Sequence, residues 1–175
     1  TLIDNKNFWL NEFDSKCNDQ EKFIIYRDLK INLRMLIVKN ILSNFKNNFQ
    51  LYGTEWKNYF IEAGANIEKK RRIQNLYSGN ICLDFGSITG SLTLYPRSIE
   101  IIESGGYLLQ LRQSDSSQIF GKYEDYFTFN NLQDLNKKLK NLVEDFELYK
   151  SQLRSLNEIF QNSKQRIEKQ LDLIL

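Results

Sequence analysis

The sequence predicts one α/β domain built on a parallel sheet with helices on both faces. Short apolar runs, typical of buried strands, alternate along the chain with segments whose apolar residues recur every three or four positions. Glycine, and in one place proline, marks the ends of several of these segments. Strands that alternate with helices in this way form parallel sheets that are covered on both sides. The 175 residues are enough for one domain with its own core.

The composition is that of an ordinary folded protein, with 41% hydrophobic and 26% charged residues. The net charge is only +2, and the densest basic run is Lys69–Arg72. Nucleic-acid-binding proteins usually carry a concentrated basic face, so we expect no nucleic-acid partner. No apolar stretch approaches the roughly 20 residues of a transmembrane helix, and no signal sequence is evident, so we expect no transmembrane segment and a cytoplasmic location.

Histidine is absent, which excludes Ser-His-Asp and Cys-His catalysis within these residues. Cys17 and Cys82 lie far apart, and Cys82 stands in an apolar run that suits a buried free thiol better than a disulfide. No closely spaced cysteine pair or histidine set is present to hold zinc. We therefore expect no metal site.

The amino-terminal half predicts an arm, a long helix and several short elements. Residues 1–24 are largely polar and predict an arm or linker, with the main domain at 25–175. Apolar residues at spacings of three and four predict a helix over 25–45, buried along much of its length. The following elements are predicted in turn: a strand at 49–52, a helix at 55–63 ended by Gly64, a strand at 67–69, and a helix at 72–78 ended by Gly79.

The best-marked element of the second half is a helix over 97–104. Pro96 precedes it and Gly105-Gly106 follow it, which is the asymmetry expected of a short helix. The remaining elements are predicted as follows: a strand at 81–85, a loop from 86 to beyond 90, a strand at 107–111, a polar loop at 112–121, a strand at 126–129, a helix capped by Asn130 or Asn131, and a long final helix over 148–175.

The segment 94–100 is the most informative for function. Ligands of parallel sheets bind beyond the carboxyl ends of the strands, and a helix amino terminus suits a phosphate because its N–H groups are unpaired. Arg97 adds a planar cation in the first turn, and Glu100, one turn later, could accept both hydroxyls of a ribose. The same spacing also suits a surface ion pair that only stabilises the helix, so the residues alone leave both interpretations open.

Residues 97–109, Arg-Ser-Ile-Glu-Ile-Ile-Glu-Ser-Gly-Gly-Tyr-Leu-Leu, resemble the Arg-x-x-Glu-x-x-x-x-Gly-Gly-x-Leu-Leu signature of GT-B glycosyltransferases of the spore-maturation-protein-like branch, among the group 1 glycosyl transferases. Further segments are similar to that family in the same order, and the resemblance covers about residues 45–160. These segments are the Tyr-Gly-x-x-Trp strand end at 52–56, the tyrosine-bearing helix and buried strand at 76–84, the Phe-Gly element at 120–121, the acidic stretch and aromatic strand at 124–129, and the Asn-Leu-x-Asp-Leu helix start at 131–135.

This resemblance implies the carboxy-terminal, donor-binding half of a GT-B fold, a Rossmann-like sheet with a long final helix. It implies a hexosyltransferase-type activity that uses a nucleoside-diphosphate sugar without metal or cofactor, and the sequence has no Asp-x-Asp motif. It assigns Glu100 to the donor ribose and Arg97 to the diphosphate, and it places Arg71 and Tyr77 at the base. The acceptor site and catalytic residues would lie in a preceding amino-terminal domain, so we expect this fragment to be inactive alone.

Two other interpretations stay open. The chain could be a non-catalytic interaction module of the same fold, kept for its final helix or a partner surface. The basic run Lys69–Arg72 could instead bind phosphate or nucleic acid. The chain also departs from the family pattern, since Glu103 stands where a small residue is usual and the final helix lacks a closing basic-aromatic pattern.

Overall fold

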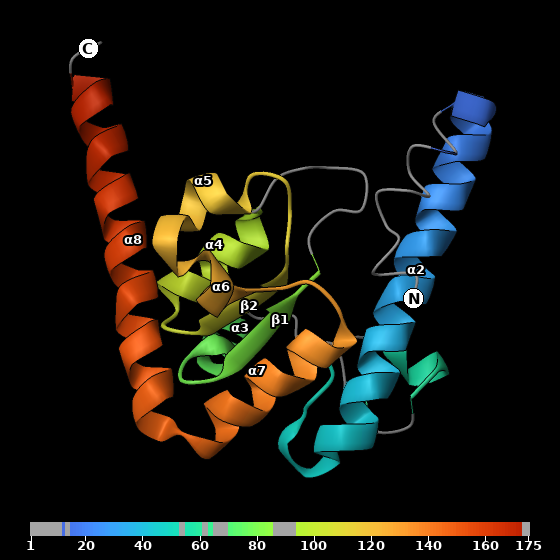
Figure 1. The fold of residues 1–175 in the computed structure, drawn as a ribbon, viewed down its shortest axis with the longest axis horizontal. Coiled ribbons are helices and arrows are strands. Elements are labelled where there is room, and N and C mark those ends of the chain that lie inside the picture. The colour runs from blue at the N-terminus through green and yellow to red at the C-terminus, as the bar shows by residue number, and fades with distance from the viewer. Residues whose placement is uncertain are drawn as a thin grey trace.

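The computed structural model shows a parallel sheet flanked by helices (Figure 1). It describes residues 12, 15–52, 55–60, 63–64, 70–85 and 94–172. The strands β1 (Ile81–Asp84), β2 (Tyr107–Leu111) and β3 (Thr128–Phe129) pair in parallel in the order β1-β2-β3. The long helices α2 (Asp19–Phe45) and α8 (Phe146–Asp172) stand on opposite sides of the sheet, and α7 (Leu132–Glu144) runs between their lower ends in this view. The predicted α/β, Rossmann-like class with a long final helix is confirmed.

Helix α2 begins at Asp19, six residues before the Ile25 at which the apolar periodicity begins. Asn18 caps it, because its side chain accepts hydrogen bonds from the backbone N–H groups of Gln20 and Glu21. The Glu21 carboxylate in turn accepts from the Asn18 N–H at 2.9 Å, which completes a capping box. The helix is confirmed, but the periodicity places its start too late because a polar cap, and not an apolar face, marks its first turn.

The packing of α2 changes along its length. Its second half enters the core through Leu33, Ile37 and Ile41. Its first half exposes large apolar side chains, including Phe23 at 69% and Ile24 at 50%. The expectation of burial along much of the helix therefore holds only for its second half.

The central strand β2 is buried at all five positions. The hydroxyl oxygen of Tyr107, at its start, lies 2.5 Å from Gln152 Oε1 and 2.8 Å from the Tyr126 carbonyl oxygen. The Tyr107 ring stacks on Tyr149 with centroids 5.6 Å apart. Gln152 and Tyr149 both belong to α8, so the first half of the final helix packs against this domain.

The predicted strand at 49–52 is wrong, because only Tyr52 of the described residues there makes a β-bridge, an isolated parallel one with Gly64. Gly64 is part of this bridge and does not end a helix, and its N–H donates to the Leu51 carbonyl oxygen at 2.6 Å. The predicted helix at 55–63 is shortened to the 3₁₀ turn η2 (Glu55–Asn58).

The region between β2 and α7 is more helical than predicted. The expected loop at 112–121 contains α5 (Ser116–Phe120) and the start of the 3₁₀ turn η3 (Gly121–Tyr123). Half of the expected strand at 126–129 belongs to α6 (Glu124–Phe127), and only β3 is extended. The aromatic residues there fit both a helical and an extended periodicity. The helical turn forms because it buries Phe127 completely, with its ring centroid 5.5 Å from that of Phe120. The strand predicted at 67–69 and the loop at 86–90 lie outside the described residues.

The helices that border β1 and β2 are confirmed. α3 (Lys70–Tyr77) and α4 (Pro96–Glu103) are followed by Gly79 and Gly105, whose φ angles are 72° and 75°. Asn131 caps α7 through a hydrogen bond from the Asp134 N–H. Gly106 lets the end of α3, α4 and β2 meet closely, since a Cβ there would lie 2.8 Å from the Tyr77 carbonyl oxygen.

Replacing Gly106 with Ala should lower the free energy of unfolding by about 1–3 kcal/mol, because the added methyl group overpacks this junction. The matched control is Gly79→Asn, since a Cβ at Gly79 meets nothing within 4 Å and Asn tolerates a positive φ, at a cost below about 1 kcal/mol. Urea denaturation of the two variants measures the difference. Equal losses would contradict the close approach at Gly106.

Burial raises the pKa of the Cys82 thiol from 9.0 to about 12. Because the thiolate is the reactive form, Cys82 should react far more slowly than a free thiol with an aromatic disulfide reagent at pH 8. The folded Cys17→Ser variant should therefore show no rapid thiol, and should show one after unfolding in urea. A rapidly reacting thiol in the folded variant would show that β1 is less well covered than the structure indicates.

Candidate functional site

The site lies where β1 ends and α4 begins. Asp84, the last residue of β1, is 6% exposed, and Ser98 in the first turn of α4 is fully buried. The Ser98 hydroxyl donates a hydrogen bond of 2.7 Å to Asp84 Oδ2 and accepts one of 3.4 Å from the Tyr95 N–H. Pro96 starts the helix, where its missing N–H costs nothing. The amino terminus of α4 is thereby held beside the end of the strand, the place where parallel sheets bind ligands.

Arg97 and Glu100 occupy the first and second turns of α4. Arg97 is exposed, whereas Glu100 is half-buried. Within the described part of the chain, no ion pair joins these two side chains, so the structure does not form the surface pair that was the alternative interpretation of their spacing. Both charged groups therefore keep their capacity to bind a ligand.

Tyr77, at the end of α3, is within electrostatic reach of this pair. Its half-buried position raises the pKa of its hydroxyl, while Arg97 lowers that pKa and Glu100 raises it. The phenol is therefore within electrostatic reach of both groups, although they come from a different helix. Arg71 lies in the first turn of α3, and its side chain is outside what the structure describes, so its assignment to the base stays a prediction.

Two basic residues of α2 that the sequence analysis did not single out lie within electrostatic reach of this site. Lys30 and Arg34 are one helical turn apart. Burial lowers the pKa of Arg34, Arg97 lowers it further, and Asp84 raises it. Burial likewise lowers the pKa of Lys30, which Arg34 and Arg97 lower further and Asp84 raises. The signal in the sequence that could have pointed to Lys30 and Arg34 is their spacing, because they are two cations four residues apart on a helix that was otherwise assigned to the core.

A row of polar side chains crosses the sheet next to this cluster. Gln110 of β2 is in register with Asp84 of β1 and with Thr128 of β3, so the three side chains project from the same face. Gln110 is 1% exposed, and neither its amide nitrogen nor its amide oxygen has a hydrogen-bond partner among the described residues. Buried side-chain amides are rarely left without hydrogen-bond partners. Gln110 is therefore an unusual feature of these strand ends.

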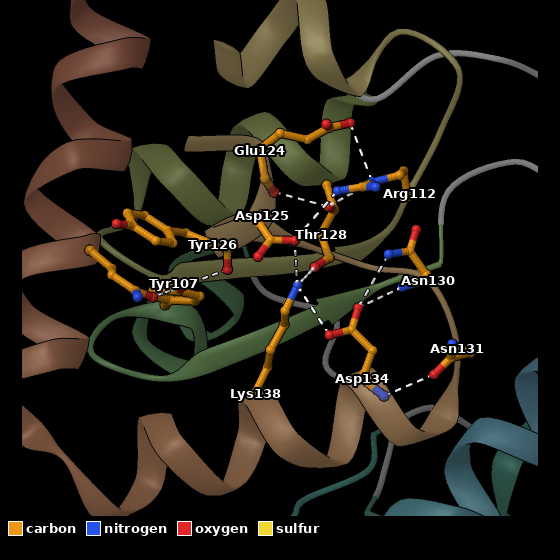
Figure 2. Close-up of polar contacts among 11 residues, drawn as sticks. Tyr107, Arg112, Glu124, Asp125, Tyr126, Thr128, Asn130, Asn131, Asp134 and Lys138 are labelled. Carbon is orange, nitrogen blue, oxygen red and sulfur yellow. Dashed lines mark hydrogen bonds and ion pairs between the residues drawn. The ribbon is translucent and has the colours of Figure 1, made fainter. Parts of the chain in front are cut away.

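A second charged cluster lies at the ends of β2 and β3 (Figure 2). Arg112 Nε lies 3.4 Å from Glu124 Oε1, and Lys138 Nζ lies 3.3 Å from both Asp125 Oδ1 and Asp134 Oδ1. Lys138 also donates to a β3 carbonyl oxygen at 2.7 Å. Each cation here faces carboxylates, so this cluster neutralises itself and fastens α6 and α7 to the sheet.

A cavity of about 230 Å³ opens beside this second cluster, and it is lined by residues of α6, α7 and α8. None of the site residues predicted from the sequence lines it. Within the described ranges, no three His, Cys, Asp or Glu side chains gather as metal ligands would. No helix in those ranges has the length and apolar character needed to cross a membrane.

Taken together, the parallel sheet and the cations at its strand ends define a Rossmann-like domain with a charged site where β1 meets α4. A model of the glycosyl transferase-like family matches residues 27–172, which include both Lys30 and the whole sheet. The chain therefore belongs to the glycosyl transferase-like family, as its resemblance to glycosyltransferases predicted. No curated protein and no solved structure matches it significantly. The spore-maturation-protein-like branch and the GT-B half stay predictions.

Replacing Ser98 with Ala should lower the free energy of unfolding by about 1.5–3 kcal/mol, because a hydrogen bond to a buried carboxylate is lost. The matched control is Ser104→Ala directly after the same helix, where the Ser104 hydroxyl donates to the Glu100 carbonyl oxygen and not to a charged group. The control should cost less than about 1 kcal/mol. Chemical denaturation measures both, and similar losses would show that Ser98 does not hold α4 to β1 as described.

Proposed function

We propose that this chain is the donor-binding domain of a glycosyltransferase, which takes a nucleoside-diphosphate sugar at the carboxyl end of β1. The observation that carries the proposal is the position of Arg97 and Glu100 on the first two turns of α4, which Ser98 holds to the end of β1, in a member of the glycosyl transferase-like family. We include in this proposal the spore-maturation-protein-like branch and the GT-B arrangement.

The proposed roles follow from charge and exposure. Arg97 and the backbone N–H groups of the first turn of α4 bind the diphosphate, because the exposed guanidinium and the helix terminus both favour negative charge. Glu100, one turn deeper and half-buried, accepts the two ribose hydroxyls. Tyr77 and Arg71 contact the base. The donor would thus lie with its phosphates outermost along α4.

The proposed enzyme is cytoplasmic and independent of metal and cofactor, since protein cations supply the charge that balances the diphosphate. The acceptor, and the group that removes its proton, belong to an amino-terminal domain of the GT-B arrangement. The proposed domain therefore binds the donor by itself and transfers no sugar without that partner domain.

Calorimetric titration with UDP, GDP and dTDP tests this function. One of the three should bind with a dissociation constant in the micromolar to millimolar range, and Glu100→Ala should weaken it about tenfold through loss of the charged ribose hydrogen bonds. Inorganic diphosphate, which has no ribose, should bind equally to both proteins. Glu103→Ala, at an exposed position of the same helix, is the control. Equal weakening of nucleotide and inorganic diphosphate would exclude the ribose assignment.

A non-catalytic interaction module of the same fold is the second candidate. The apolar side chains exposed on α2, which include Phe23, Ile24 and Ile31, favour it because such faces often meet a partner. This candidate predicts a defined oligomer in sedimentation velocity and no nucleotide binding, whereas the donor-binding domain predicts nucleotide binding whatever its oligomeric state.

A further inference from the structure

Lys30 and Arg34 of α2 and Arg97 of α4 form a group of cations near the end of β1. Lys30 and Arg34 both lie within electrostatic reach of Arg97, which starts α4. Among the described residues, Asp84 is the carboxylate that acts on both α2 cations in the opposite sense. The second charged cluster differs, because there Arg112 and Lys138 face three carboxylates. Among the described residues, cations thus outnumber carboxylates at the end of β1, where Asp84 and Glu100 stand with three cations, whereas carboxylates outnumber cations at the ends of β2 and β3.

Arg34 carries the clearest sign of an incomplete site. Its Nε atom is buried, and no acceptor for it is found in the described part of the chain. A buried charged donor without an acceptor destabilises a protein, and a second cation nearby adds repulsion. Proteins keep such arrangements where a ligand supplies the missing charge, at the expense of the stability of the unliganded state.

We propose that Lys30 and Arg34 complete the diphosphate site with Arg97, and that the bound diphosphate fastens α2 to the end of β1. This inference rests on the proposed function, and it extends the site to a helix outside the α4 segment. A diphosphate presents several negatively charged oxygens on two linked phosphorus atoms, so it can meet cations from two helices at once. A single phosphate spans less distance and neutralises less charge.

The inference predicts that removal of the charge of Arg34 changes stability and ligand affinity in opposite directions. Removing the charge of Arg34 relieves repulsion and an unmet hydrogen-bonding need, so the unliganded protein keeps or gains stability. The same change removes a ligand contact, so diphosphate binds more weakly and stabilises the folded state less. A merely structural arginine would lower the stability of the unliganded protein and leave the affinity for diphosphate unchanged.

The test compares Arg34→Met and Lys30→Met, which keep an apolar stem, with Arg27→Met. Arg27 is the control because it is an exposed arginine of the same helix that pairs with Asp28. Melting temperatures are measured without ligand, with inorganic phosphate and with inorganic diphosphate, and affinities for inorganic diphosphate and for UDP, GDP and dTDP are measured by calorimetry. Diphosphate should raise the melting temperature of the wild type more than phosphate does.

Each of the two site variants should bind diphosphate at least tenfold more weakly than the wild type and lose most of its diphosphate-induced rise in melting temperature. Their unliganded melting temperatures should equal or exceed that of the wild type, and Arg27→Met should behave as the wild type does. Lys30 is less buried than Arg34, so Lys30→Met decides the question if Arg34→Met does not fold.

Diphosphate affinity within twofold of the wild type in both site variants would overturn the inference. If a nucleoside diphosphate then still binds through Glu100, the proposed function stands without the α2 cations. Binding of inorganic diphosphate through Lys30 and Arg34, with no binding of any nucleoside diphosphate, would support the anion site and overturn the donor function. Binding of neither ligand by the wild type would overturn both.

Discussion

The buried hydrogen bond between Ser98 and Asp84 holds the first turn of α4 against the end of β1. Arg97 precedes Ser98 directly and Glu100 follows it by two residues, so this bond sets the position of both. It also keeps the carboxylate of Asp84 at the strand end, where it acts on the two cations of α2. The close approach at Gly106 supports the same junction from the other end of α4, where β2 begins.

The two charged clusters of this domain have different consequences. Around Lys138, carboxylates from α6 and α7 surround the ammonium group, and the charges are satisfied within the protein. Around Arg34, cations from α2 and α4 come together with less opposing charge and with an unsatisfied donor. The charge balance thus differs between neighbouring strand ends of one sheet, and we propose that the cation-rich end is the one that binds the ligand.

Much of the fold could be predicted because local signals and tertiary packing agree. Pro96 and Gly105 mark α4 clearly, and the short apolar run of β2, interrupted by Gln110 alone, directly follows the glycine pair that ends α4. The errors occurred where the local pattern is ambiguous. The aromatic residues before β3 satisfy both helical and extended periodicities, and the bridge at Tyr52 depends on Gly64, which the local pattern presented as the end of a helix.

The candidate site was only partly predictable for a related reason. Arg97 and Glu100 share one short helix whose resemblance to a known signature pointed to them. Lys30 and Arg34 lie far from them in the sequence, and on a helix with apolar periodicity two cations are usually solvated. Only the tertiary packing of α2 brings these charges within electrostatic reach of Arg97, and no local pattern encodes that proximity.

Mapping of backbone amide chemical shifts is the most direct test of where the donor binds, and a chain of 20.8 kDa suits it. The nucleoside diphosphate that binds should shift the amide signals of Arg97, Ser98 and Ile99 in the first turn of α4, and those of Lys30 and Arg34 in α2. Shifts confined to the cavity beside Tyr126 and Lys138 would contradict the account, because the donor would then bind among α6, α7 and α8 and not at the end of β1.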